Sequence, residues 1–201
     1  GLNRQEHLNM LVRYLSLTLI MAGLVFAAAA LYKTFNHQPD VGWAPTPDHS
    51  AELGLAWASV GPGDVLYELG CGDGRVAIVA ARLGARVVCV EIDSALAAKA
   101  GQAVKAAGLE DRVEVLNEDL FDVDLSPATV VFIFLLPSVN ERLRPVFEAS
   151  LQPGTRIISR EFEIKGWPAG RRLELPGFLF LGWTMPLEVP QQAVHPLEKS
   201  L

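Results

Sequence analysis

Short apolar runs alternate with amphipathic stretches through most of the chain. Four runs bounded by turn-forming residues predict β-strands. They are VLYEL (65–69), RVVCVEI (86–92), RVEVL (112–116) and TVVFIFLL (129–136). Apolar residues at helical spacing predict helices over about 50–60, 74–83 and 94–108. Strands that alternate with helices predict an α/β fold, with a parallel sheet that carries helices on both faces.

The second half of the chain continues this pattern. The run 129–136 is apolar throughout, so both faces of that strand should be covered. Ser138 and Glu141 have the spacing of a capping box for a following helix, and Pro145 is expected to bend or split that helix. PGTRIISREF (153–162) predicts a fifth strand. RRLEL and FLFLGWTM, separated by PG, predict an antiparallel pair near the C-terminus.

The stretch NHQPDVGWAPTPDHS is rich in proline and polar residues, which is typical of a linker. Pro45 and Pro47 keep it extended, and Asp48 or Ser50 is expected to cap the helix that follows. Ser94 is expected to cap the helix 94–108. The predicted organisation is an N-terminal segment (1–33), a linker or lid (34–49), a folded domain (50–188) and a tail (189–201).

Residues 14–32 read YLSLTLIMAGLVFAAAALY, nineteen residues without a charge. As a helix this segment would measure about 28 Å, close to the roughly 30 Å of a bilayer's hydrocarbon core. We therefore expect an N-terminal transmembrane helix over about 14–32, with the lipid bilayer as its partner. A cleaved signal peptide or a buried core helix are the alternatives.

Charge and cysteine content exclude several classes of function. The 201 residues carry a formal net charge of -6 and no basic run interleaved with aromatic residues, so nucleic acid is not an expected partner. The only cysteines, Cys71 and Cys89, form no CxxC pair and have no histidine nearby. Neither a zinc site nor a disulfide framework is therefore expected, and no metal ion is predicted.

The stretch LYELGCGDGR places Gly70, Gly72 and Gly74 at alternate positions after Glu68. The dinucleotide fingerprint GxGxxG fails, because its sixth position would be Arg75, and no GK[ST] of a phosphate-binding loop follows. Alternate glycines let the backbone turn sharply and meet a ligand closely, while the next helix offers free N–H groups to a carboxylate. Glu68 can attract an ammonium. A ligand that carries both a carboxylate and an ammonium is an amino acid.

Two more acids follow the next two strands. Glu91 lies nineteen residues beyond the central glycine, a spacing at which an acid accepts the hydroxyls of a ribose. Asp119 is placed to accept from the exocyclic amine of adenine, with Leu120 or Phe121 over the ring, and Glu118 is its rival. Each acid alone would also fit an ordinary strand end or turn. Amino acid, ribose and adenine together describe S-adenosyl-L-methionine.

The motifs YELGCGDGR, VEID and NEDLF resemble those of the class I S-adenosylmethionine-dependent methyltransferases, over residues of about 50 to 188. That family implies a Rossmann-like seven-stranded sheet whose last strand is antiparallel. The uncharged span, WAPTP and FLLPSVNERLRPVFEASLQPGTRIISREFEIKGW resemble, more narrowly, membrane-anchored protein lysine methyltransferases that act on the ATP synthase c subunit or the adenine nucleotide translocase. In that group aspartate is usual where this chain has Glu68.

The resemblance implies a site for S-adenosyl-L-methionine. Its expected residues are Glu68, Gly70, Cys71, Gly72, Gly74, Glu91, Ile92, Asp119, Leu120, Leu136, Pro45 and Thr46. Pro45 and Thr46 would act as part of a lid, unless they belong to a plain linker. Candidates for the acceptor mouth, any of which could equally be core, are Trp43, Leu136, Pro137, Phe162 and Trp167. No catalytic residue is assigned, because methyl transfer mainly requires an aligned nucleophile and excluded water.

The expected function is methyl transfer to a lysine of a membrane protein. A phospholipid or small lipid-soluble acceptor is the runner-up, and a non-catalytic, cofactor-binding scaffold in a membrane complex is the third possibility. Arg4 and Arg13 before the span outnumber Lys33 after it, which would place the domain outside by the positive-inside rule. Because the cofactor is made in the cytosol or imported into the matrix, we instead expect a bacterial inner membrane with a cytoplasmic domain, or a mitochondrial inner membrane with a matrix domain.

Overall fold

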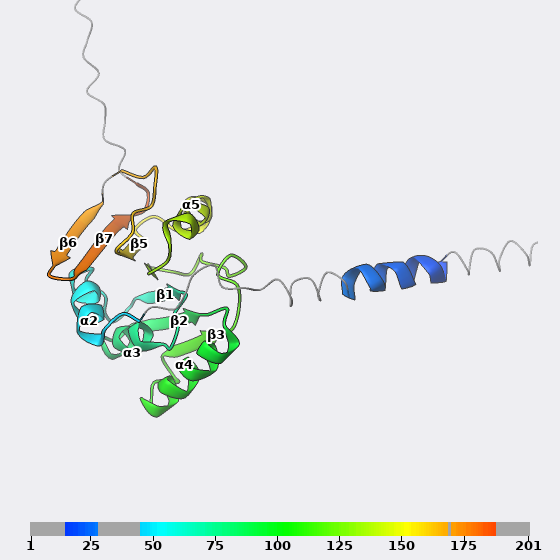
Figure 1. The fold of residues 1–201 in the computed structure, drawn as a ribbon, viewed down its shortest axis with the longest axis horizontal. Coiled ribbons are helices and arrows are strands. Elements are labelled where there is room, and N and C mark those ends of the chain that lie inside the picture. The colour runs from blue at the N-terminus through cyan, green and yellow to red at the C-terminus, as the bar shows by residue number, and fades with distance from the viewer. Residues whose placement is uncertain (1–14, 28–44, 169, 188–201) are drawn as a thin grey trace, which may run out of the picture. The chain divides into compact units, whose positions relative to one another are not determined.

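The structure is a computed structural model that describes residues 15–27, 45–168 and 170–187. It has two units, 1–38 and 39–201. In the first, residues 15–27 form a helix whose side chains are all exposed (Figure 1). Within the described ranges, no helix combines the length and apolar character needed to cross a bilayer. Residue 14 and residues 28–32 of the predicted span lie outside the described residues, as do Trp43, Arg4, Arg13 and Lys33.

The second unit is built on one seven-stranded sheet with the order β3-β2-β1-β4-β5-β7-β6. The strands are β1 (Val65–Leu69), β2 (Arg86–Val90), β3 (Val113–Leu116), β4 (Val130–Ile133), β5 (Arg156–Arg160), β6 (Arg171–Leu175) and β7 (Phe178–Thr184). Strands β1 to β5 pair in parallel, and β7 is antiparallel to both β5 and β6. The predicted seven-stranded sheet with an antiparallel last strand is confirmed.

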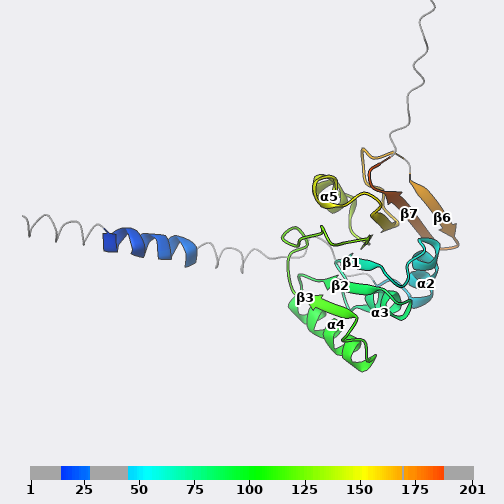
Figure 2. The ribbon, with the colours of Figure 1, turned by 180° about the vertical axis from the view of Figure 1, so that it is seen from behind.

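Helices cover both faces of this sheet. They are α2 (Asp48–Trp57), α3 (Arg75–Arg82), α4 (Ser94–Ala106) and α5 (Pro137–Ser150). Helices α2, α3 and α4 lie on one face and α5 lies on the other, as the two opposite views in Figures 1 and 2 show. The carboxyl ends of the parallel strands therefore remain the edge at which a ligand can reach the sheet.

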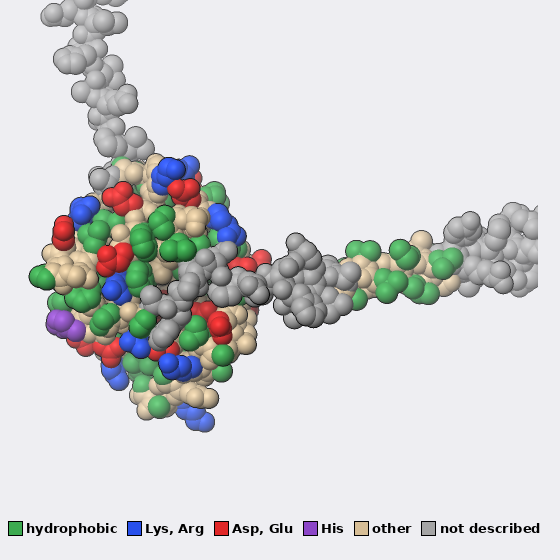
Figure 3. All heavy atoms as spheres, viewed as in Figure 1, with side chains coloured by type: hydrophobic (Ala, Val, Ile, Leu, Met, Phe, Trp, Pro, Cys, Tyr) green, Lys and Arg blue, Asp and Glu red, His purple; other side chains and the backbone are tan. Residues whose placement is uncertain are grey.

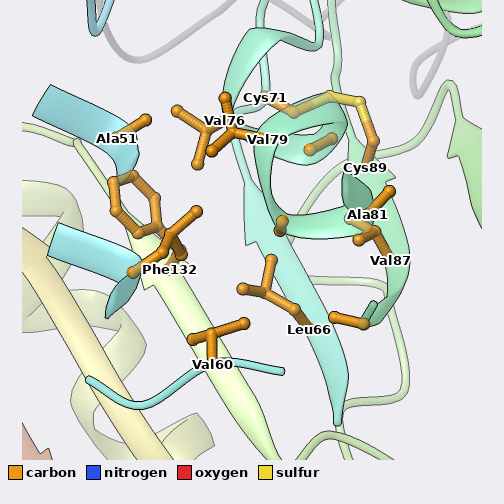
Figure 4. Packing of buried hydrophobic residues seen from close by; sticks show 14 of the residues in the cluster. Ala51, Val60, Leu66, Cys71, Val76, Val79, Ala81, Val87, Cys89 and Phe132 are labelled. Carbon is orange, nitrogen blue, oxygen red and sulfur yellow. A yellow bond between two sulfur atoms is a disulfide. The ribbon is translucent and has the colours of Figure 1, made fainter. Parts of the chain in front are cut away.

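Two apolar clusters, one on each face, form the core. Strand β4 supplies both, since Phe132 packs on the side of α2 and α3 while Val131 and Ile133 pack on the side of α5. These residues are at most 1 % exposed, which confirms that both faces of the apolar run are covered. In the first cluster, Ala51 of α2 lies beside Val76 of α3 (Figure 4). Burying a side chain as large as Phe132 stabilises the fold by about 1.5–3 kcal/mol.

The helix caps differ from the prediction. Asp93, not Ser94, caps α4, and its Oδ1 accepts hydrogen bonds from the backbone N–H groups of the second and third helical residues at 2.8 and 3.1 Å. Asp93 was overlooked because Ser94, the next residue, is itself a good cap, and only the backbone decides between neighbours. Helix α2 begins after Pro47 without a capping side-chain bond, so the cap expected from Asp48 or Ser50 is wrong.

Helix α5 also starts differently. Its first residue is Pro137, and no side chain caps it, so the capping box of Ser138 and Glu141 is wrong. Proline suits a first helical position because its missing N–H would have no partner within the helix there. The expectation was that Pro145 bends or splits the helix; the helix continues through Pro145 to Ser150, so it is not split there.

Candidate cofactor site

The register of the parallel strands brings the predicted acids to one edge. A single transverse row of paired residues crosses the sheet through Leu116, Val90, Leu69, Ile133 and Ser159. The next residue of each strand follows this row at the carboxyl edge. These residues are Asn117, Glu91, Gly70, Phe134 and Arg160. Glu91 and the glycine loop thus lie together, and Phe134 and Arg160, which were not predicted as site residues, stand on the same edge.

The glycine loop between β1 and α3 leaves no room for side chains. Gly70 has a φ of +79°, and an added Cβ would lie 2.9 Å from Cδ2 of Leu135. Gly74 has a φ of +80°, and its Cβ would lie 3.0 Å from Cβ of Ala100. Gly74 is the N-cap of α3 and has no capping side chain, so the first N–H groups of the helix face the loop. The loop therefore presents bare backbone and helix N–H groups to a ligand's carboxylate.

Glu68 fits the ammonium of such a ligand. Its side chain belongs to a residue only 4 % exposed, and Oε2 has no hydrogen-bond partner among the described residues. Burial raises the pKa of Glu68 well above its usual value, against the opposing effect of a hydrogen bond from the backbone of Ala77. A cation at this oxygen would supply the missing partner and favour the ionised carboxylate. A buried acceptor without a partner is costly, so this atom indicates a ligand.

Glu91 shapes the glycine loop through hydrogen bonds to its backbone and to the backbone after β2. Its Oε2 accepts from the backbone N–H of Gly72 at 2.7 Å, and Oε1 accepts from the N–H of Asp93 at 2.9 Å. Each carboxylate oxygen can accept a second hydrogen bond, so both remain able to accept from ribose hydroxyls. The carboxylate therefore ties the glycine loop to the end of β2 at the place where the ribose was predicted.

Beyond β3 the structure adds a residue that the sequence did not single out. The side-chain N–H₂ of Asn117 donates to the carbonyls of Glu91 and Ile92 at 2.8 and 3.0 Å, which fixes the loop after β2. The sequence feature that could have identified Asn117 is its position directly after the third strand. Asp119 accepts from the N–H of Phe121 at 3.0 Å, so one oxygen closes a short turn. Leu120 is half-buried against the α5 face.

A disulfide joins Cys71 to Cys89, which corrects the expectation that these cysteines form no disulfide framework. The glycine loop bends back over β2, because the N–H groups of Gly70 and Cys71 both donate to the carbonyl of Val90, at 2.8 and 3.0 Å. This brings the Cα atoms of the two cysteines within 5.4 Å, although they are 18 residues apart in sequence. Spacing alone does not reveal such a pair, because the bend of the loop creates it.

The predicted lid residues lie at the carboxyl end of β5. Thr46 is 4 % exposed, and its hydroxyl accepts from Nη1 of Arg160 at 2.8 Å. Pro45 is exposed, and its carbonyl lies 3.5 Å from the same nitrogen. The pKa of Arg75 is raised mainly by its hydrogen bond to Asp73, and in smaller part by the charge of Asp48. Helices α2 and α3 contribute side chains to the same apolar cluster.

Aromatic side chains line the next part of the edge. The rings of Phe134 and Phe162 stack with centroids 6.3 Å apart, and the guanidinium of Arg160 lies 4.4 Å from the centre of the Phe134 ring. Leu136 is 44 % exposed beside them in sequence, and Pro137 is exposed at the start of α5. These residues form the part of the edge that we call the acceptor mouth: Phe134, Leu136, Pro137, Arg160 and Phe162.

Trp167 does not belong to the acceptor mouth. Its ring packs against Phe147 and Trp183, with centroids 6.1 and 5.7 Å away, and its Nε1 donates to Glu148 near the C-terminal end of α5. Helix α5 starts at the carboxyl edge, so this tryptophan cluster lies toward the other end of the sheet. Among the described residues, no group of three or more histidine, cysteine, aspartate or glutamate side chains could hold a metal ion.

Comparison with known proteins agrees with this geometry. The model of a family described as the ANTKMT methyltransferase domain matches residues 68–171. A protein-lysine N-methyltransferase of Saccharolobus islandicus is 42 % identical over 134 residues, which cover 66 % of this chain and 83 % of that protein. The adenine nucleotide translocase lysine N-methyltransferase of Mus musculus is 33 % identical over 103 residues, 51 % of this chain but only 45 % of the mouse protein.

A solved structure is similar over most of the described domain. It is a crystal structure of an RNA methyltransferase from Salinibacter ruber in complex with S-adenosyl-L-homocysteine. The TM-score is 0.70 and the sequence identity is 46 %, with 74 % of this chain and 97 % of that chain covered. The names of the relatives therefore agree on methyl transfer and differ in the acceptor, which is a protein lysine in two of them and RNA in the third.

Proposed function

This chain belongs to the family of ANTKMT methyltransferase domains and is an S-adenosylmethionine-dependent methyltransferase, and we propose that its acceptor is a lysine side chain of a membrane protein. The observation that carries the proposal is the carboxyl edge of the sheet. There the unpartnered oxygen of Glu68, the carboxylate of Glu91 and the bare glycine loop fit the ammonium, ribose and carboxylate of the cofactor. Two relatives named as lysine methyltransferases support the acceptor.

The cofactor supplies a methyl group on a positively charged sulfur. In the proposed reaction the neutral amine of lysine attacks the methyl carbon, a C–N bond forms, the C–S bond breaks, and the amine nitrogen then loses a proton to solvent. Glu68 and Glu91 would hold the cofactor, and the stacked rings of Phe134 and Phe162 would help to exclude water from the line of attack. No protein base is required for bond formation, since the attacking amine has already lost its proton.

RNA is the competing acceptor, because the Salinibacter ruber relative is described as an RNA methyltransferase. The charge of this chain favours protein. Its formal net charge is -6, and on the face in Figure 3 lysine and arginine side chains lie scattered among acidic ones. An enzyme that binds RNA usually gathers cations into a patch that neutralises several phosphates.

We further propose that the N-terminal segment anchors the enzyme in a bilayer, with the catalytic domain in the cytosol or the mitochondrial matrix. Two observations support this: residues 14–32 carry no charge, and the described helix 15–27 exposes large apolar side chains along its length, including Phe26 at 81 %. Protease treatment of sealed inverted vesicles should digest the domain from the cytosolic side. A domain digested only from the opposite side would contradict this orientation.

Transfer of tritiated methyl groups tests the acceptor. The purified full chain is incubated with labelled S-adenosylmethionine and, separately, with membrane proteins, membrane lipids and total RNA, and a Glu91→Ala variant is the control for cofactor-dependent label. Label in protein, located on lysine by peptide mass spectrometry, supports the proposal. Label in lipid or in RNA would show that this molecule, and not lysine, is the acceptor. Absence of label in all three, despite binding of S-adenosylhomocysteine, would indicate a scaffold.

A further inference from the structure

Arginine side chains of β5 attach both ends of helix α2 to the sheet. At the carboxyl end of the strand, Nη1 of Arg160 donates to the hydroxyl of Thr46 at 2.8 Å and lies 3.5 Å from the carbonyl of Pro45. At the amino end, Nη1 of Arg156 donates to the carbonyls of Ala58 and Ser59, just after α2, at 2.6 and 2.9 Å. The two arginines are four residues apart in a strand, so they point to the same face.

The surroundings of the two arginines differ. Arg156 also pairs with Asp64, and its side chain is 27 % exposed, far from the carboxyl edge. Arg160 is 8 % exposed, lies over the Phe134 ring, and has no hydrogen-bond partner for Nε, since the nearest oxygen of Glu161 is 3.6 Å away. Burial of a guanidinium is costly unless the group is paired, and Arg160 is paired with the Thr46 hydroxyl and the Glu161 carboxylate. Its main hydrogen bond holds Thr46, 114 residues earlier in the chain.

Residues 45–47 lead directly into α2. Ala51 of α2 and Val76 of α3 belong to the same apolar cluster (Figure 4). Arg160 itself follows the same transverse row of the sheet as Gly70 and Glu91. Thr46 is thus held at the carboxyl edge of the sheet, which also carries the glycine loop and the acceptor mouth.

We infer that Arg160 is a positioning residue: through Thr46 it holds residues 45–47 as a wall of the cofactor site, and so sets the affinity for the cofactor. This inference rests on the proposed function. If residues 45–47 occupy their binding position only about a tenth of the time once the Arg160–Thr46 bond is lost, the apparent dissociation constant of the cofactor rises about tenfold. Arg156, which holds the far end of α2, serves the stability of the fold and not the affinity.

Calorimetric titration of the full chain with S-adenosylhomocysteine tests this inference. Thr46→Val keeps the shape of the side chain and removes the hydroxyl, and Arg160→Lys keeps the charge and removes the fork of donors. We expect each to weaken binding about tenfold. Thr46→Ser should restore wild-type affinity. The matched control is Arg156→Lys, which should lower the melting temperature but leave the affinity within about twofold of wild type.

Equal affinity of wild type and Thr46→Val would overturn the inference, even if the arginine variants failed to fold. Weakening by Arg156→Lys as large as that by Arg160→Lys would also overturn it, because both arginines would then act only through the fold. A wild-type chain that bound no S-adenosylhomocysteine would instead overturn the proposed function itself. If the chain binds S-adenosylhomocysteine but methylates no lysine, the proposed acceptor is wrong and the inferred role of Arg160 still holds.

Discussion

Reduction of the Cys71–Cys89 disulfide should destabilise the domain by a predictable amount. The bond closes a loop of 18 residues in the glycine-loop region, and both cysteines are at most 4 % exposed. In the chain-entropy model, closure of a loop of this length stabilises the folded state by about 3 kcal/mol at 25 °C. With a urea m-value of about 2 kcal/mol/M, reduction should lower the unfolding midpoint by roughly 1.5 M.

Urea unfolding followed by far-UV circular dichroism, with and without a phosphine reductant, measures this shift. Mass spectrometry after alkylation reports the number of thiols in each sample. The Cys71→Ala/Cys89→Ala double variant is the control, since its midpoint should not respond to reductant. If two thiols are alkylated in the reduced protein and its midpoint stays within about 0.3 M of the oxidised one, the loop-closure reasoning is refuted.

Four further substitutions test the packing and charge of the domain. Burial raises the folded-state pKa of Glu68 above 4.5, so the contribution of this residue to ligand-free stability falls as pH rises above that value. The melting temperature should therefore fall between about pH 5 and 8, and Glu68→Gln should make that fall less steep. A slope unchanged by the substitution would contradict this. Gly54→Ala should cost about 1–3 kcal/mol in urea unfolding, because its Cβ would lie 2.6 Å from Cε1 of Phe180. Gly101→Ala, with nothing within 4 Å, should instead stabilise by about 1 kcal/mol, and equal effects would refute the clash. Asn117→Ala should weaken S-adenosylhomocysteine binding several-fold in calorimetry, and wild-type affinity would show that the loop keeps its shape without those two hydrogen bonds.

Most elements of the sheet could be predicted because their apolar pattern matches their burial. The strand predicted over 129–136 is covered on both faces as far as β4 extends, to Ile133, whereas Leu136 is 44 % exposed. Phe134, Leu136 and Pro137 lie beyond the end of the strand and belong to the acceptor mouth, while Leu135 is buried in the core, and all four are as apolar as the strand itself. Hydrophobicity therefore does not distinguish the end of a buried strand from the start of an apolar site.

The acids of the cofactor site could be predicted because parallel strands bring their carboxyl ends to one edge. Glu91 and Asp119 are identified by their places after β2 and β3, and Glu68 by its place in the last two residues of β1, directly before the glycines. No sequence feature identifies Arg160 in this way, because its partner Thr46 belongs to a segment whose composition is typical of a linker. The Cys71–Cys89 bond was missed for a similar reason, because the bend of the glycine loop brings the two residues together. Contacts that depend on how two loops fold back are not encoded in local spacing.

The two halves of the carboxyl edge carry opposite charge, and the proposed reaction needs both. On the side of β1 and β2, Glu68 and Glu91 offer carboxyl groups to a cofactor whose sulfonium and ammonium are positive. On the side of β4 and β5, Arg160 lies over the ring of Phe134, and its Nε lies 3.6 Å from Oε1 of Glu161. An ammonium that approached Arg160 among the apolar side chains of the acceptor mouth would meet a like charge and lose part of its hydration, and both effects lower the pKa of a lysine. The charged lysine is thereby disfavoured next to the methyl group, and the neutral amine, which alone has the lone pair to attack, is the form that the mouth accepts.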